Sequence, residues 1–192
     1  MDKETVRLAI RQAFENEKRN GRLGPGDLQA RDDRFRYQVP PDTAENWWDF
    51  SDSFKKNLSK NLAHANNKSM PFLLPAAMMA TLDGVDNNEG SFVYYTLCLH
   101  HPEKRNPGYG STDYIDYLRD IKPADIAAAF YLTHAQTVAV GLFMEWWLKE
   151  KGQYDVFDPR RSDMHTGADL QREIQIYEQQ LRIVNDWIKL QK

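Results

Sequence analysis

Histidines and carboxylates are the side chains of this chain that could act as metal ligands. His100 and His101 are adjacent, and Glu103 follows in the same loop. Such a group could bind zinc, and a metal-dependent enzyme could use His100, His101 or His165 with nearby carboxylates. However, the sequence has no HExxH pattern, and no two histidines stand four residues apart on a helix. The spacing therefore favours structural or incidental roles, with a small metal-dependent helical enzyme as the alternative.

Signals for a catalytic nucleophile or a phosphate-binding loop are weaker. No serine lies in a GxSxG elbow. The single cysteine, Cys98, lies between Leu97 and Leu99, which predicts a small buried hydrophobic residue and excludes an internal disulfide. The segment GYGST at 108–112 lacks the lysine and the longer glycine spacing of a P-loop. We therefore predict no catalytic residue, no cofactor and no bound metal ion.

The long loop 100–113 and the acidic turn after it favour binding of a partner. The loop carries Tyr109, a residue type enriched at interfaces. Three aspartates then follow at spacings of three and four, which places them on one face of a helical turn. A solvated face is the simpler explanation, and a patch for a basic ligand is the functional one. The predicted partner-binding residues are His101, Glu103, Tyr109, Asp113, Asp116 and Asp120.

Length and composition predict one domain over residues 1–192, and the spacing of its apolar residues predicts that this domain is a mainly α-helical, irregular bundle. The chain is 41% hydrophobic with a formal net charge of −3, which argues against a general nucleic-acid binder because that class needs a basic face. The charged start MDKETVRLAI is unlike a signal peptide. The longest uncharged stretch, 126–144, contains Thr133, His134 and Gln136, which fits a core segment better than a membrane span. We expect a soluble, cytoplasmic protein that binds neither nucleic acid nor membrane.

The segment 132–152 predicts the central helix of the domain. Thr133 and Gln136 form a capping box, in which each side chain bonds to the backbone N–H of the other residue. Apolar residues then cover much of the circumference, as expected for a buried helix. Gly152 is the predicted stop.

Further helices are predicted on both sides of this one. The pattern indicates helices at 3–18, from near Thr43 to Ala65, and at 71–83, 91–99, 114–119 and 123–130. The second of these restarts or kinks at Ser51–Ser53. The third has Pro75 in its first turn and Gly84 past its end. The segment 91–99 could also be a strand, and RFRYQV at 34–39 is a short candidate strand. Trp47 and Trp48 are adjacent and lie among Asp42, Glu45, Asp49 and Asp52. We expect either both rings in the core or one in the core and one exposed.

A long C-terminal helix at about 167–190 completes the predicted bundle. Its apolar residues alternate steps of four and three, the spacing of a coiled-coil seam: Leu170, Ile174, Tyr177, Leu181, Val184 and Ile188. The pattern predicts a partner helix, either within the domain or in a second copy of the chain. The sequence leaves both open.

The order of these segments resembles a family of small helical bacterial proteins of unknown function. The resemblance covers about 45–148 and rests on Trp48 and Phe50, LLPAAMMATL, FVYYTLCL and the helix that starts at Leu132, Thr133 and Gln136. These are helix caps and core positions, so the resemblance implies a small bacterial helical fold and transfers no functional residue.

The absence of catalytic motifs, the mild acidity and one elaborate loop together favour a non-catalytic function. We predict a protein that binds a protein partner, most specifically an immunity or antitoxin protein that blocks a toxin. Blocking requires complementary shape and charge rather than chemistry. The alternatives are the metal-dependent enzyme and a structural homodimer through the C-terminal helix.

Overall fold

The protein is mainly α-helical, as predicted. The computed structural model describes residues 1–18, 44–62, 65, 67–86, 91–151, 159 and 167–191. Within these ranges the elements are α1 (Lys3–Phe14), η3 (Trp47–Asp49, a 3-10 turn), α2 (Asp52–Leu62), η4 (Asn67–Ser69, a 3-10 turn), α3 (Met70–Asp83), α4 (Ser91–Cys98), α5 (Tyr114–Asp120), α6 (Pro123–Ala129), α7 (His134–Lys151) and α9 (Gly167–Lys189). The candidate strand 34–39 and the predicted stop at Gly152 lie outside these ranges. None of the helices in the described part combines the length and apolar character needed to cross a bilayer.

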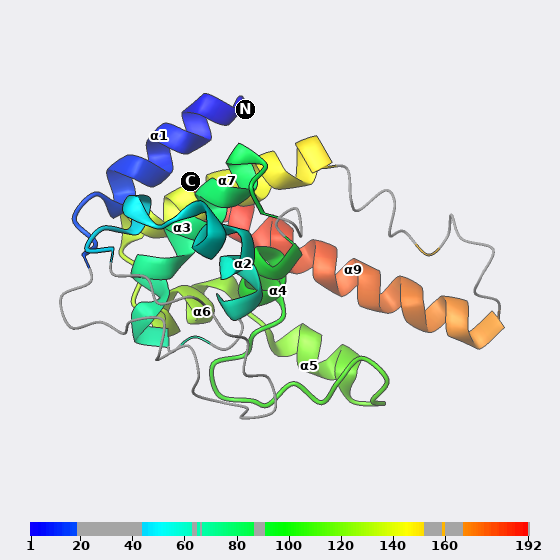
Figure 1. The fold of residues 1–192 in the computed structure, drawn as a ribbon. Helices are drawn as coiled ribbons and strands as arrows, with labels where there is room; N and C mark the ends of the chain where they lie inside the picture. The colour runs from blue at the N-terminus through cyan, green and yellow to red at the C-terminus, as the bar shows by residue number, and fades with distance from the viewer. Residues whose placement is uncertain are drawn as a thin grey trace.

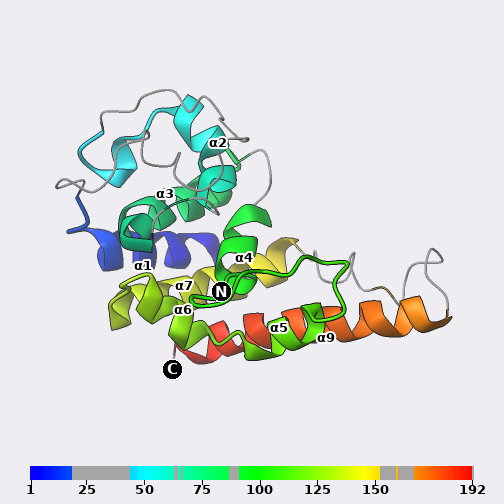
Figure 2. The same ribbon diagram turned by 90° about the horizontal axis from the view of Figure 1, so that it is seen from below.

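The helices pack as a series of layers. Helix α9 packs against α7 and α5, α7 packs against α1, α1 against α3, and α3 against α2. Figure 2 shows this order, with α5 and α9 on one side of the molecule and α2 on the other. In Figures 1 and 2 the first turns of α9 project beyond α7. This overhang is where loop 100–113 meets α9.

The predicted capping box opens α7. The N–H of Thr133 donates to Gln136 Oε1 at 2.9 Å, and the N–H of Gln136 donates to Thr133 Oγ1 at 3.3 Å. The Gln136 amide also donates to Glu17 Oε1 at 2.9 Å, which ties this helix start to the segment after α1. The buried side of α7 is broad and includes Ala139, Val140, Phe143, Met144, Trp146 and Trp147. The prediction of a central helix is confirmed.

The two apolar segments before the loop are both helices. Gly84 ends α3 in the left-handed conformation (φ 70°), with its N–H directed to the carbonyls of Ala80 and Thr81, as expected for a glycine stop. The prediction that Pro75 lies in the first turn is wrong, because α3 begins at Met70 and Pro71 takes that place. The segment 91–98 is helical rather than extended, with the Cys98 side chain fully buried.

Two predicted helix boundaries, the end of the first helix and the start near Thr43, differ from the structure, whereas the predicted restart at Ser51–Ser53 is confirmed by the start of α2. Helix α1 ends at Phe14 rather than at Lys18, and the Trp47 indole N–H caps it by donating to the Phe14 carbonyl at 2.9 Å. Thr43 lies outside the described residues, but Asn46 is extended, so the next α-helix starts only at Asp52. Trp47 is buried as expected, and its neighbour Trp48 is 42% exposed.

The long C-terminal helix matches its prediction closely, but its buried face is wider than the predicted seam. Tyr177 and Val184 of the seam are buried, whereas its other members are partly exposed. The buried set also includes Ile176, Ile183 and Trp187, because α9 faces several helices of its own chain at once. The seam therefore has partners within the domain, and a homodimer through α9 stays a prediction.

Gly141 sets the distance between α7 and α9. A Cβ atom built on Gly141 would lie 2.8 Å from the Trp187 carbonyl oxygen and 3.3 Å from Gln191 Cβ. The first distance is shorter than van der Waals contact allows and involves backbone, which gives way less easily than a side chain. Glycine here therefore permits the close approach of the two helices.

Replacing Gly141 with alanine tests this close approach. We expect Gly141→Ala to lower the free energy of unfolding by about 1–2 kcal/mol, because overpacking outweighs the gain in helix propensity. That loss corresponds to a fall in Tm of about 4 °C. Gly110→Ala is the matched control, because a Cβ there meets nothing within 4 Å. Equal Tm values for the two variants, measured by circular dichroism, would contradict the packing argument.

Candidate functional site

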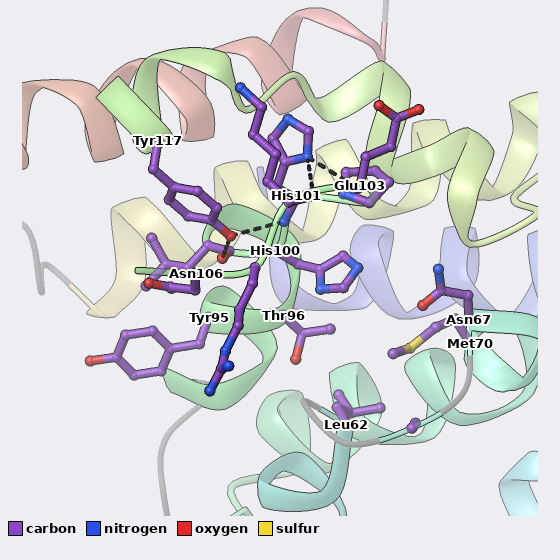
Figure 3. A pocket seen from close by; sticks show the side chains of 15 residues that line it. Leu62, Asn67, Met70, Tyr95, Thr96, His100, His101, Glu103, Asn106 and Tyr117 are labelled. Atoms are coloured by element: carbon purple, nitrogen blue, oxygen red, sulfur yellow. Dashed lines mark hydrogen bonds between the residues drawn. The ribbon is translucent and has the colours of Figure 1, made fainter. Parts of the chain in front are cut away.

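The first residues of loop 100–113 are fixed by a buried tyrosine of α5. The Tyr117 hydroxyl donates to the Leu99 carbonyl at 2.8 Å and accepts from the N–H of His101 at 3.1 Å. Burial raises the pKa of Tyr117 to about 12 because it disfavours the charged phenolate. His101 Nδ1 in turn accepts from the N–H groups of Glu103 and Lys104, both at 3.1 Å. Figure 3 shows these bonds at the edge of a pocket behind the loop.

The same bonds disfavour a metal site at His101. Because Nδ1 accepts two hydrogen bonds, the neutral ring carries its proton on Nε2. A metal ion on Nε2 would require that proton on Nδ1, where two N–H groups already point. In the described part of the chain, no three His, Cys, Asp or Glu side chains gather as a metal-binding group. His100 packs its ring on Phe130 at 5.4 Å, and His165 lies outside the described residues.

The predicted acidic face is exposed but partly neutralised. Asp120 pairs with Lys104 of the loop, and this ion pair lowers the pKa of the Asp120 carboxyl. Asp116 pairs with Arg119 at 2.7 Å on the same helix. Asp113 forms no ion pair within the described residues and accepts a hydrogen bond from the Thr112 hydroxyl at 3.0 Å. The negative potential of this face is therefore weaker than three unpaired aspartates would give.

The tip of the loop is fastened to α9. Arg172 donates to the carbonyl of Tyr109 at 2.9 Å and to the carbonyl of Ser111 at 2.7 Å. The Tyr109 hydroxyl donates to Glu173. Partial burial and this carboxylate raise the pKa of the Tyr109 phenol above its usual range. The loop thus has a defined shape although Tyr109 is 53% exposed.

A row of aromatic rings joins the predicted residues Tyr109 and His101. The ring of Tyr109 lies 5.5 Å from Tyr114, Tyr114 lies 6.3 Å from Tyr117, and Tyr117 lies 6.0 Å from His101. Tyr114 and Tyr117 are buried and lie between the exposed ring of Tyr109 and the half-buried ring of His101.

Tyr131, beside the loop, is one of the residues that the sequence did not reveal. It lines a second pocket, of about 650 Å³, together with the predicted residues His101, Glu103 and Asp120. Its φ of 56° is the one left-handed value among the non-glycine residues of the described part. The Tyr131 N–H donates to the Ala128 carbonyl at 3.0 Å and the Leu132 N–H to the Ala127 carbonyl at 2.9 Å, which is a Schellman motif ending α6. Glycine is the usual residue at this position.

The structure divides the six predicted residues into two groups. His101, Glu103 and Asp120 share the lining of the second pocket, whereas Tyr109 lies against α9 and Asp113 and Asp116 are exposed at the start of α5. Sequence reasoning missed the residues that hold or flank them, which are Lys104, Tyr114, Tyr117, Tyr131, Arg172 and Glu173. No local pattern marks these residues, because their partners are distant in sequence or their backbone angle is unusual.

Cys98 offers no nucleophile to this site. Its side chain is fully buried, and burial raises the pKa of its thiol well above the usual value. This agrees with the prediction of a small buried hydrophobic residue.

Comparison of the chain with models of known protein families, with curated proteins and with solved structures gives no match. The resemblance to small bacterial helical proteins therefore rests on the sequence pattern alone.

Proposed function

We propose that this protein works without catalysis, by binding a protein partner through its loop–α5 face. This face is defined as loop 100–113, helix α5 and Tyr131. The observation that carries the proposal is Tyr131, whose side chain is 60% exposed although its backbone is held in the left-handed region.

The Schellman motif explains why residue 131 is left-handed, but it does not explain why that residue is a tyrosine. A left-handed non-glycine residue costs about 1 kcal/mol, and glycine would end α6 at this position without that cost. A strained backbone that presents an exposed aromatic side chain is expected where the side chain has a use outside the chain. Tyrosine is also a residue type that contributes strongly to protein interfaces.

The rest of the face fits the same use. Its backbone is held by Tyr117, by the Lys104–Asp120 pair and by Arg172, so little conformational entropy would be lost when a partner binds. Tyr109 adds a second exposed aromatic side chain. The face has the features of a preformed interface rather than those of a catalytic centre.

An immunity or antitoxin protein is the most specific form of this proposal. Such a protein needs only a rigid, complementary surface that covers a toxin. Asp113 and Asp116 are exposed at one end of the face and would steer a basic surface on the partner. We include in this proposal that the protein is bacterial and acts in the cytoplasm.

Replacing Tyr131 with glycine separates stability from function. We expect Tyr131→Gly to raise the free energy of unfolding by about 1 kcal/mol because it removes the backbone strain. Tm should then rise by about 3 °C. Tyr131→Ala keeps the strain and should show no rise, so it is the matched control. A fall in Tm for Tyr131→Gly would mean that the Tyr131 side chain stabilises the fold itself.

The partner-binding face is tested by affinity capture with charge-reversed variants. Three tagged proteins are expressed in native host cells: wild type, the double variant Asp113→Lys/Asp116→Lys and the control Glu15→Lys/Glu150→Lys. Stoichiometric partners are then identified by mass spectrometry. Both variants change the net charge equally, and the control residues are exposed on other elements. We expect wild type and control to retain one partner, and the aspartate variant to bind it about tenfold more weakly through slower association.

The outcome also distinguishes the toxin-blocking form from other binding. A captured protein that arrests growth when it is expressed alone, but not when it is co-expressed with this protein, would support the immunity hypothesis. A partner that the aspartate variant and Tyr131→Gly both retain at full affinity would remove the loop–α5 face from the proposal.

A further inference from the structure

A pocket of about 820 Å³ lies beside the first half of loop 100–113, and its lining includes the exposed loop residues Glu103, Lys104, Arg105 and Asn106. This volume lies within the range of small-molecule sites. Figure 3 shows Leu62 and Met70 on one side of the pocket, Tyr117 and His101 on the other, and His100 and Thr96 between them. The pocket thus separates the end of α2 and the start of α3 from α4 and the loop.

The lining offers apolar contact area. Leu62 and Met70 are almost fully buried and close the floor. Ala65 and Leu99 are only partly buried, and the ring of Tyr95 is 47% exposed on the wall. A flat apolar group could therefore rest against Tyr95 and lose contact with water.

The charges of the lining favour an anion. Lys104 is paired with Asp120, and Figure 3 shows the Glu103 carboxylate pointing away from Leu62 and Met70. Arg105 lines the pocket, is exposed, and forms no ion pair with the residues that the structure describes. Beside it, Asn106 uses its Oδ1 to accept from Gly108, which leaves its amide N–H groups for a ligand. A guanidinium with adjacent N–H donors suits a carboxylate, sulfonate or phosphate group.

The wall that carries these groups is held in place without a ligand. Tyr117 fixes His101, and His101 fixes the turn at Glu103 and Lys104, immediately before Arg105. A preformed wall reduces the conformational cost of binding.

We propose that this pocket binds a small organic anion with a flat apolar body, which would rest on Tyr95 while its anionic group meets Arg105. This site shares loop 100–113 with the partner-binding face, and His101 and Glu103 line it. Its proposed ligand contacts, Tyr95 and Arg105, are not among the six predicted partner contacts. It would give the protein a small-molecule ligand in addition to a protein partner.

The test uses a matched pair of fluorescent probes and the full chain. The anionic probe is 8-anilinonaphthalene-1-sulfonate, and the neutral probe is N-phenyl-1-naphthylamine, which has the same apolar body without the sulfonate. We expect one saturable site for the anion, about threefold weaker binding of the anion in Arg105→Gln, and unchanged binding of the neutral probe. Tyr95→Ala should weaken binding of both probes.

Two controls make the result specific. Arg11→Gln removes an exposed arginine of α1, and Tyr131→Ala removes an exposed tyrosine outside this pocket. Both should bind the probes as wild type does, and near-ultraviolet circular dichroism should show native packing in every variant. Absence of saturable binding, or affinities that Tyr95→Ala leaves unchanged, would overturn the proposal. Weaker binding in Tyr95→Ala with no effect of Arg105→Gln would overturn the anionic class of ligand.

Discussion

Carbonyl groups at the C-terminal ends of helices need hydrogen-bond donors, and side chains from distant helices supply them in this protein. The Trp47 indole caps α1 at the Phe14 carbonyl, and the Trp187 indole caps α4 at the Leu97 carbonyl at 2.8 Å. Arg182 donates to the carbonyls of Leu118 at 2.9 Å and Ile121 at 3.2 Å, at the end of α5. An unsatisfied buried carbonyl would cost about 1–3 kcal/mol. These bonds therefore tie the ends of α1, α4 and α5 to side chains that are distant in sequence.

Helix α9 supplies the donors for two of these carbonyl caps, and a third side chain of α9 donates to carbonyls of the loop. Trp187 binds α4 near the contact with α7 that Gly141 permits, Arg182 binds the end of α5, and Arg172 binds the loop tip. One long helix thus connects the buried core to the partner-binding face. Both proposed uses of loop 100–113 depend on this connection, because both need a loop of fixed shape.

The sequence predicts what local chemistry determines. The capping box at Thr133 and Gln136 and the glycine stop at Gly84 are local signals, and both are present where the pattern placed them. The range of α9 follows in the same way from its apolar spacing. The six proposed contact residues were chosen from loop length and charge, and the structure shows where they lie without testing their role.

Long-range contacts and backbone angles explain what the sequence could not predict. The bond from Arg172 to Ser111 joins residues 61 positions apart, and the bond from Trp47 to Phe14 at the end of α1 joins residues 33 positions apart. Helical periodicity in the sequence predicts neither of these two hydrogen bonds. Nothing around Tyr131 marks a left-handed residue, since glycine is the usual signal for one.

Hydrogen exchange of the loop in Arg172→Gln tests most directly whether α9 holds this face in place. The N–H groups of Gly108 and Ser111 are bonded to Asn106 Oδ1 at 2.8 Å and to the Gly108 carbonyl at 3.0 Å, so their exchange reports opening of the loop. We predict exchange about tenfold faster at these amides in Arg172→Gln, with α7 unchanged and with Arg119→Gln behaving as wild type. Equal exchange in Arg172→Gln and wild type would show that the loop keeps its shape without α9.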